Sequence, residues 1–422
     1  MSSLYAEHLN TLKQRGDAAL AKAGFEHLVI GSGVEKFQFL DDRPYPFRPN
    51  PQFKTWVPLS QHPHSWIAYT PGAKPVLVYH QPDDYWHVPP AVPEGFWVEH
   101  FDIRIIREPH EASVHLPKTR VAILGEADAA LVGLVPNNPK ILLDHLHYHR
   151  GFKTAYELER MRRAQDRAVK GHRAAEAAFR VGGSEREIHR AYLEATGHSD
   201  LDLPYTNIIG LGANAAVLHY QHLDTRRPLR PLSFLIDAGA EVDGYVADIT
   251  RTHAAQNGEF ADLIAAVEGE QLALCAKVRQ GTDYRNLHLE CHLRLGSVLR
   301  NAGIVDMSPD AMLAEGVTST FFPHGLGHPI GLQVHDVAGR HDEAGNEIPR
   351  PEGHPYLRMT RTLKPGMVVT IEPGLYFIPT LLAKLKAGPH AKAVDWDRVE
   401  ALTPYGGIRI EDEVACTAGA PE

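Results

Sequence analysis

The chain has 422 residues, of which 43% are hydrophobic and 23% charged, and its formal net charge is -9. This length allows two domains with hydrophobic cores, and the composition excludes a disordered or fibrous protein. The acidic balance argues against a nucleic-acid partner, which usually needs a basic face. Three cysteines in so long a chain indicate reduced thiols, and neither a signal peptide nor a membrane-length apolar segment is evident. We therefore expect a cytoplasmic protein without a membrane anchor.

The N-terminal third predicts a helix followed by short strands. Leu4, Leu9, Leu12 and Leu20 fall near one helical face, and Gly24 ends the pattern. Apolar runs bounded by Gly, Pro or charged residues predict strands of a mixed sheet at 28–30, 66–69, 75–79 and 121–124. Residues 37–51 are rich in proline and predict a long irregular loop, a kind that is more often functional than idle. We expect a smaller N-terminal α/β domain over residues 1–153.

A second domain is expected over residues 154–422. It opens with a helical stretch from Thr154 to about Phe179 that is rich in Ala, Arg and Glu. Ser184 and Glu187 then have the spacing of a capping box, which predicts the start of another helix. Further helices are predicted at 258–280 and 283–302, and strands around 234–252, 366–376 and 407–416.

Residues 322–336 read Phe-Pro-His-Gly-Leu-Gly-His-Pro-Ile-Gly-Leu-Gln-Val-His-Asp, with three histidines and three glycines. Glycine loses more conformational entropy on folding than any other residue. Such a run therefore indicates backbone held close to a neighbouring group, and imidazoles placed beside a metal or a substrate.

Two aspartates stand in a predicted hairpin, Asp237 on its first strand and Asp248 on its second. A turn centred on Val242-Asp243 would place them directly opposite each other, and a turn centred on Asp243-Gly244 would make them diagonal neighbours. Directly opposed residues have β-carbons about 5 Å apart, where like charges repel. In either register the two carboxylates share one face.

Glu372 and Glu411 each follow a β-branched run that predicts a core strand. A buried, unpaired carboxylate is costly, so four of them in apolar strands imply shared cations. Two divalent metals would neutralise their charge, with His328 or His324 as a nitrogen ligand. Such a donor set suits Mn²⁺, Fe²⁺, Co²⁺ or Zn²⁺. A two-metal site can hold a bridging hydroxide and hydrolyse an amide or a phosphoester.

These motifs, in this order, resemble those of the pita-bread metallopeptidases, the group of methionine aminopeptidase, aminopeptidase P, creatinase and prolidase. The segments 39–47, 50–58 and 84–87 are similar to bacterial Xaa-Pro dipeptidases (prolidases), a subgroup that includes organophosphorus acid anhydrolases. The resemblance covers essentially the whole chain. It implies an α/β (α+β) fold with a C-terminal pita-bread domain, a homodimer, and two divalent metals, in the first place Mn²⁺. The implied activity is hydrolysis of dipeptides with a C-terminal proline, with organophosphate triesters as side substrates.

The resemblance also implies a role for each site residue. Asp248 and Glu411 would contact both metals, Asp237 would complete one, and His328 with Glu372 the other. Glu372 would shuttle a proton, His219 and His335 would hold substrate and stabilise the intermediate, and Arg409 would brace the site. The remaining substrate-binding expectations are Arg358 for the terminal carboxylate, His324 close behind the metal ligands, Tyr205 and Leu218 in the pocket wall, and Trp86 with the Asp41-Asp42 loop from the partner subunit.

Other interpretations stay open at this point. His145, His147 and His149 alternate in a metal-like pattern, but histidine clusters are weak signals. Trp86 fits a core or interface aromatic as well as a substrate contact. The fold also occurs in binding modules that have lost the metals, although all five ligand positions are filled here. Aminopeptidase P, which acts on longer Xaa-Pro peptides, is the nearest enzymatic alternative.

Overall fold

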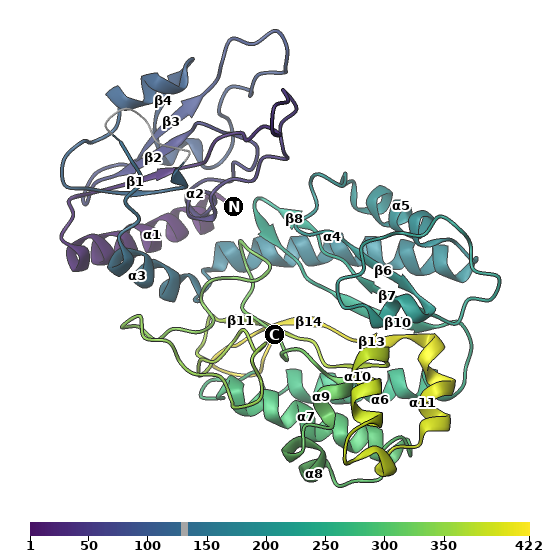
Figure 1. Ribbon diagram of the computed structural model, residues 1–422. Coiled ribbons are helices and arrows are strands. Elements are labelled where there is room, and N and C mark those ends of the chain that lie inside the picture. The colour runs from purple at the N-terminus through teal and green to yellow at the C-terminus, as the bar shows by residue number, and fades with distance from the viewer. Residues whose placement is uncertain (128–133) are drawn as a thin grey trace. The chain divides into compact units, whose positions relative to one another are not determined.

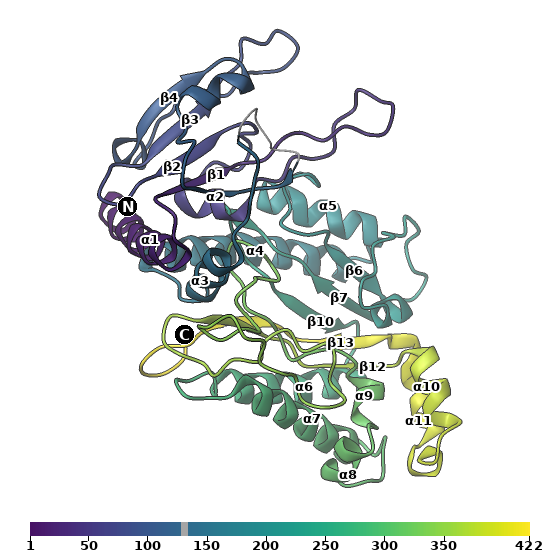
Figure 2. The same ribbon diagram turned by 60° about the vertical axis from the view of Figure 1, so that its left-hand side comes forward.

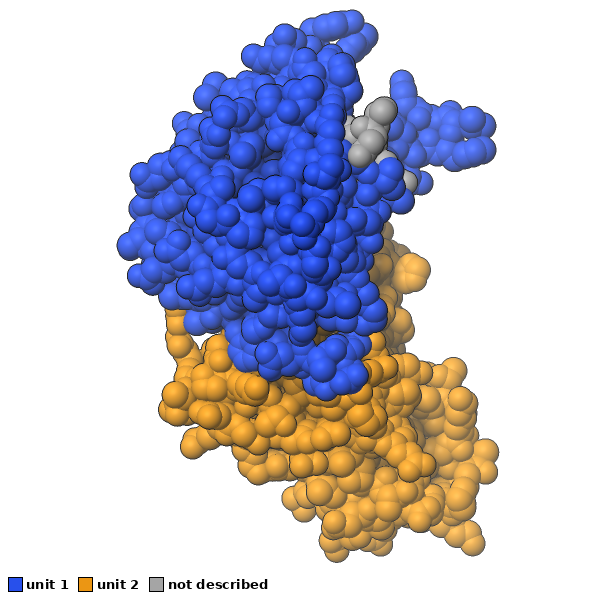
Figure 3. Space-filling view, turned by 90° about the vertical axis from the view of Figure 1, so that its left-hand side faces the viewer, with its two compact units in different colours: residues 1–160, 243–245, 341–346 blue, residues 161–242, 246–340, 347–422 orange. Residues whose placement is uncertain are grey.

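The computed structural model describes residues 1–127 and 134–422. They form two compact units, coloured in Figure 3. Unit 1 holds residues 1–160, 243–245 and 341–346, and unit 2 holds residues 161–242, 246–340 and 347–422. Each unit takes residues from three segments of the chain, whereas the expected domains are continuous. The domain limits of 1–153 and 154–422 stay a prediction.

Unit 1 is built on a mixed five-stranded sheet (Figure 1). Its strands are β1 (His27–Gly31), β2 (Trp66–Tyr69), β3 (Val76–His80), β4 (Asp102–Ile106) and β5 (Val121–Leu124). Their order is β4-β3-β2-β1-β5, with β1 and β2, and β2 and β3, antiparallel, and with β1 and β5, and β3 and β4, parallel. The four predicted strands are present. β4 was not predicted, because this edge strand buries only Ile106 fully and so lacks a continuous apolar run.

The helices of unit 1 are α1 (Ser2–Ala23), α2 (Pro51–Trp56) and α3 (Lys140–Arg150), with 3₁₀ turns η1 (Val98–His100) and η2 (Pro109–Val114). The first helix ends as predicted, because Gly24 takes the left-handed conformation (φ 75°) that glycine adopts without a Cβ penalty. Between β1 and α2 the proline-rich segment has only an isolated bridge from Phe37 to Pro44. Within it, Phe39 and Leu40 are each 90% exposed.

In unit 2 the strands lie between α4 and α5 on one side and α6 and α7 on the other, in both Figure 1 and Figure 2. The helices are α4 (Ala155–Arg180), whose residues 155–160 belong to unit 1, α5 (Glu185–Thr196), α6 (Glu259–Cys275), α7 (Tyr284–Asn301), α8 (Pro309–Ala314), α9 (Thr318–Phe321), α10 (Pro379–Lys386) and α11 (Trp396–Leu402), with η4 (Gly212–Ala216), η5 (Ala391–Ala393) and η6 (Thr403–Tyr405). The predicted capping box is formed, with Ser184 and Glu187 each accepting a bond from the other's backbone. No helix in the described part of the chain is both long enough and apolar enough to cross a membrane.

The strands from β6 onward form small sheets of the orders β10-β7-β6, β11-β14, β12-β13 and β8-β9, and all their residues but Tyr245 belong to unit 2. They are β6 (Ile208–Leu211), β7 (Ser233–Asp237), β8 (Glu241–Val242), β9 (Tyr245–Val246), β10 (Thr250–Ala254), β11 (Val368–Ile371), β12 (Gly374–Tyr376), β13 (Gly407–Arg409) and β14 (Asp412–Ala415). An isolated bridge between Thr250 and Glu411 links β10 to the residue before β14. This bridge thus joins the sheet of β10, β7 and β6 to the sheet of β11 and β14.

The register between β7 and β10 decides between the two hairpin alternatives. Asp237 pairs with Thr250, so Asp248 lies two residues further along and the two aspartates are diagonal neighbours. The turn is centred on Asp243 and Gly244, whose φ angles of 52° and 88° are both left-handed, as a type I′ turn requires. This register keeps the carboxylates on one face without opposing them directly.

Candidate metal centre

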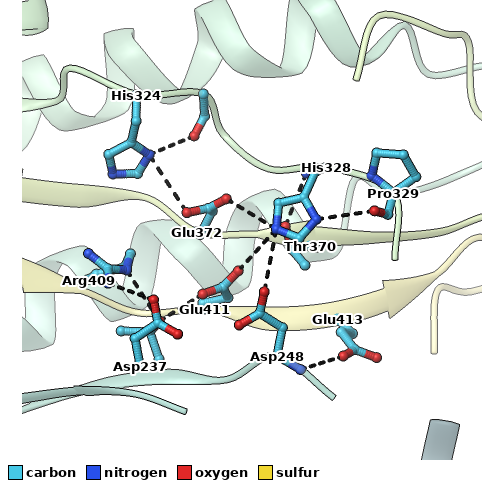
Figure 4. Close-up of polar contacts among 12 residues, drawn as sticks. Asp237, Asp248, His324, His328, Pro329, Thr370, Glu372, Arg409, Glu411 and Glu413 are labelled. Carbon is cyan, nitrogen blue, oxygen red and sulfur yellow. Dashed lines mark hydrogen bonds and ion pairs between the residues drawn. The ribbon is translucent and has the colours of Figure 1, made fainter. Parts of the chain in front are cut away.

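Four carboxylates and one imidazole converge at the ends of strands in unit 2 (Figure 4). Asp237 ends β7, Asp248 lies between β9 and β10, Glu372 lies between β11 and β12, and Glu411 lies between β13 and β14. His328 comes from the loop between α9 and β11. These are the five residues expected to hold the metals, and the fold brings all of them together.

His328 is at the centre of the group. Its Nε2 lies 3.5 Å from Oδ2 of Asp248, 3.8 Å from Oε1 of Glu372 and 4.0 Å from Oε1 of Glu411. Its Nδ1 lies 3.1 Å from the carbonyl oxygen of Pro329, to which the ring N–H donates. That hydrogen bond leaves the lone pair on Nε2, directed at the carboxylates, as in metal-binding histidines.

The glycines of this loop allow the backbone to approach its neighbours closely. A Cβ on Gly327 would lie 2.2 Å from the carbonyl oxygen of Thr370 and 2.5 Å from the hydroxyl of Tyr284. No side chain fits there. The adjacent N–H of His328 donates to Oγ1 of Thr370 at 3.1 Å, which fixes the loop against β11. The glycine run therefore has the close-approach role inferred from the sequence.

The electrostatics of the group favour a cation. Burial raises the pKa of Asp237 and of Glu411, and it raises that of Glu372 to about 7. Burial alone would lower the pKa of His328, but its interactions with Asp248 and Glu372 outweigh burial and raise it. The same negative field would attract a metal ion.

The donor set fits divalent metal ions. Oδ1 of Asp237 is buried and has no hydrogen-bond partner among the residues that the structure describes. Ligand atoms of Asp248, His328 and Glu411 lie within 4.8 Å of one another. An oxygen-rich set with a single imidazole is typical of Mn²⁺, Fe²⁺, Co²⁺ or Zn²⁺ sites.

A second set of residues holds the carboxylates in place. Arg409 donates from Nη2 to Oδ2 of Asp237 at 2.8 Å, and Thr250 donates to Oε2 of Glu411 at 2.7 Å. The hydroxyl of Tyr205 donates to Oδ1 of Asp248 at 2.5 Å, and the backbone N–H of Asp248 donates to Oε1 of Glu413 at 2.7 Å.

Glu413 and Thr250 were not identified from the sequence as site residues. The signal for Glu413 was its place two residues after Glu411, because alternate residues of a strand share a face. Thr250 carried no comparable signal, since its role depends on the bridge between distant strands.

A cavity of about 650 Å³ opens onto the metal centre. Besides the five candidate ligands, its lining includes the expected residues Leu218, His219, His324, His335, Arg358 and Arg409. Tyr205 is not in the lining and lies instead against Asp248. Trp86 belongs to unit 1, where it is 78% exposed.

The cavity histidines differ in their surroundings. The ring of His335 packs edge-on against that of His328, with centroids 4.5 Å apart. Nδ1 of His324 donates to the carbonyl oxygen of Gly325 at 2.8 Å, and its Nε2 accepts from the Tyr376 hydroxyl at 2.8 Å. His324 therefore has both ring nitrogens engaged, although its Nδ1 also lies 3.7 Å from Oε2 of Glu372, whereas His328 turns Nε2 to the carboxylates.

Comparison with known proteins agrees with this geometry. Residues 3–148 match the model of the Xaa-Pro dipeptidase N-terminal domain, and residues 159–418 match that of metallopeptidase family M24. A Xaa-Pro dipeptidase of Xanthomonas campestris pv. campestris (strain B100) is 58% identical over 426 residues, covering 100% of this chain and 97% of the relative. One of Stenotrophomonas maltophilia (strain R551-3) is 56% identical, covering 99% and 95%.

Solved structures show the same fold at lower identity. Pseudomonas aeruginosa aminopeptidase PepP has a TM-score of 0.74 and 23% identity, covering 100% of this chain and 94% of its own. Zn-substituted E. coli aminopeptidase P has a TM-score of 0.73 and 24% identity, covering 98% and 94%. The resemblance inferred from the motifs is confirmed, and the chain belongs to metallopeptidase family M24.

Proposed function

We propose that this chain is a Xaa-Pro dipeptidase, which hydrolyses dipeptides with a C-terminal proline. The observation that carries the proposal is the cavity that joins two buried carboxylates, two partly buried ones and His328 to a cationic side chain, Arg358. The relatives named Xaa-Pro dipeptidase, which match over essentially the full chain, support it.

Two divalent ions per chain, in the first place Mn²⁺, are the proposed cofactors, with Co²⁺, Zn²⁺ or Fe²⁺ as alternatives. Asp248 and Glu411 would bind both ions, Asp237 would complete one, and His328 with Glu372 the other. Together the carboxylates carry four negative charges, which two divalent ions balance. When bound, such ions supply an activated water and polarise the carbonyl of the scissile amide.

The protein's own groups position the dipeptide. Arg358 lines the cavity with an exposed side chain and can pair bidentately with the substrate's terminal carboxylate. That pairing would restrict the enzyme to dipeptides. His219 and His335 would hold the scissile carbonyl, and Leu218 would form part of the wall. Glu372 would carry a proton to the proline nitrogen, which has no hydrogen of its own and leaves poorly without one.

A chain of hydrogen bonds supports these groups from behind. The hydroxyl of Tyr376 donates to Nε2 of His324 and accepts from Nη1 of Arg409 at 2.9 Å. Arg409 in turn holds Asp237. His324 would therefore contact substrate with a ring whose orientation is fixed on both sides.

We further propose that the N-terminal domain completes the site of a second subunit in a homodimer. Exposed aromatic and apolar residues on two of its loops support this: Phe39, Leu40, Tyr85 and Trp86 are 90%, 90%, 86% and 78% exposed. Contiguous exposed apolar patches often mark protein–protein contacts. Trp86 and the Asp41-Asp42 loop would then border the partner's pocket.

Hydrolysis of Leu-Pro beside Leu-Pro-Gly tests the proposal, on chelator-treated protein supplied with Mn²⁺. Metal-dependent cleavage of the dipeptide alone is expected. Equal cleavage of the tripeptide would instead assign the activity of aminopeptidase P. Cleavage of neither would favour a binding module, and a phosphotriester substrate would then be assayed with the same protein.

A further inference from the structure

Three histidines outside the metal centre, His288, His292 and His354, form a cluster that we name the histidine triad. His288 and His292 lie four residues apart on α7 and so share one face of the helix. His354 comes from the loop between α9 and β11. Ring nitrogens of all three lie within 4.8 Å of one another. His288 and His292 are each 1% exposed, and His354 is partly exposed.

Two nitrogens of the triad are buried without partners. Nε2 of His288 and Nδ1 of His354 lie 2.9 Å apart and share a proton. Nδ1 of His288 and Nε2 of His292 have no hydrogen-bond partner among the described residues. Leaving a buried polar atom without a hydrogen-bond partner destabilises the fold. Apolar rings would fill the same space without that cost, so packing alone does not account for three imidazoles.

The orientation of His292 is that of a metal ligand. Its Nδ1 lies 2.8 Å from Oγ1 of Thr318, and donation to that hydroxyl leaves the lone pair on the unpartnered Nε2. Metal-bound histidines almost always donate their other ring N–H in this way. Burial also lowers the pKa of His288, and it lowers that of His292 to about 3, so both rings are neutral at neutral pH. The neutral form is the one that binds metals.

We propose that the histidine triad is a further metal site, which binds one Zn²⁺ or a similar nitrogen-preferring ion. Three imidazoles without a carboxylate suit Zn²⁺, Ni²⁺ or Cu²⁺ better than Mn²⁺ or Mg²⁺. Zn–N bonds of about 2.0–2.1 Å place tetrahedral ligand nitrogens roughly 3.3 Å apart. The triad is near this spacing, with one pair of nitrogens 2.9 Å apart and one nitrogen from each ring within 4.8 Å of the others. When the ion binds, the proton between His288 and His354 moves from Nε2 to Nδ1 of His288, so that each ring stays neutral and offers one lone pair to the metal.

The triad is distinct from the carboxylate centre but lies beside the wall of its cavity. The ring of Phe322 packs against His292 on one side and His324 on the other, with centroids 4.9 and 4.7 Å apart. His354 directly precedes Pro355 and Tyr356, which line the cavity. An ion at the triad would therefore anchor the segment that leads to Arg358. The proposal does not depend on the peptidase activity.

Zinc content measures the site directly. Tag-free full-length protein is saturated with Zn²⁺, desalted, and analysed for zinc per chain by mass spectrometry. The wild-type chain should retain one more zinc than His354→Asn and one more than His292→Asn. His390→Asn, which alters another partly exposed histidine of unit 2, is the matched control and should retain the wild-type amount.

A second measurement separates the triad from the carboxylate centre. In an Asp248→Asn background, Co²⁺ should still give the visible absorption bands of a four-coordinate site with three imidazole ligands and one solvent ligand. Those bands should vanish when His354→Asn is added, with circular dichroism confirming that the variant is folded. Equal zinc in wild type and both triad variants, or no such bands in the Asp248→Asn background, would overturn the proposal and leave the triad as a packing cluster.

Discussion

Arg409 donates a hydrogen bond from Nη2 to Oδ2 of Asp237 across 2.8 Å, and its Nη1 donates to the hydroxyl of Tyr376 at 2.9 Å. Arg409 is 4% exposed, so its guanidinium is a buried cation that binds one carboxylate oxygen of Asp237 and leaves Oδ1 free. Asp237 ends β7 and Arg409 ends β13, and the bond therefore ties two sheets together at the metal centre. One planar group fixes both a candidate ligand and the tyrosine that orients His324.

Replacing Arg409 by lysine should weaken this arrangement while keeping the charge. A lysine ammonium cannot reproduce the planar pair of donors, so one of the two bonds is lost. A hydrogen bond to a charged group contributes about 1.5–3 kcal/mol, which corresponds to a fall in kcat of about 10- to 100-fold if the group acts in the transition state. Steady-state kinetics on Leu-Pro measure this. Arg294→Lys, which alters an arginine that pairs with Glu270 and Glu290, is the control and should leave kcat unchanged. A wild-type kcat for Arg409→Lys would contradict the bracing role.

Asp248→Asn should lose both metals together. Asp248 is proposed to bind both ions, and an amide oxygen without charge is a poor bridging ligand. Metal analysis after Mn²⁺ loading and desalting should find less than one ion per chain and no peptidase activity. Asp243→Asn also removes one negative charge, but in the turn beside Arg160, where asparagine tolerates the positive φ of 52°. It should keep wild-type metal content. Retention of both ions by Asp248→Asn would refute the bridging assignment.

Arg358→Ala should chiefly raise KM for dipeptides. Loss of a charge-assisted bond of about 1.5–3 kcal/mol to the substrate carboxylate predicts a rise of about 10- to 100-fold, with kcat less affected. Leucyl-prolinamide supplies the internal control, because it lacks the carboxylate. Wild type and variant should bind the amide with similar KM. An unchanged KM for Leu-Pro would remove the proposed role of Arg358.

Much of the metal centre could be predicted because its residues interrupt apolar strands. Glu372 and Glu411 were found as carboxylates after β-branched runs, and they do lie at the ends of β11 and β13. The choice between His324 and His328 could not be made from residues alone, since both lie in the same glycine-rich loop. It depends on which ring nitrogen the surrounding hydroxyls and carbonyls engage, and Tyr376 comes from a distant strand.

The histidine triad could not be predicted from the sequence, because its residues come from two distant segments of the chain. His288 and His292 have the four-residue spacing that places two side chains on one helical face, but His354 follows them by more than sixty residues in a loop. Their proximity is a product of tertiary packing. His145, His147 and His149 were a more visible pattern. On helix α3 His145 and His149 are four residues apart and their ring centroids lie 4.3 Å from each other, whereas His147 is two residues from each and does not share their face.

The final prediction concerns stability with and without metal. Burial raises the pKa of Glu372 and of Glu413 from 4.5 to about 7 and about 8, so the folded metal-free chain binds protons that the unfolded chain has released. Groups of this kind stabilise the fold fully below their unfolded pKa, and that contribution is lost as the pH rises through their folded pKa values. Bound divalent ions stabilise the ionised carboxylates instead. The difference in Tm between Mn²⁺-loaded and chelator-treated protein should therefore grow from about pH 5.5 to about pH 8. Histidines that stay neutral in both forms contribute equally to the two Tm values, so their contribution cancels in the difference.

Glu413→Gln separates this effect from metal affinity. Glu413 accepts from the backbone of Asp248 and is not a proposed ligand, and the amide oxygen of glutamine can still accept that bond. In the chelator-treated variant, Tm should decline less between about pH 6 and about pH 8.5 than in wild type, because one group with a raised pKa has been removed. Differential scanning calorimetry measures both series. A metal-dependent Tm difference that is constant with pH, together with identical slopes for wild type and Glu413→Gln, would show that these buried carboxyl groups are already ionised in the metal-free fold.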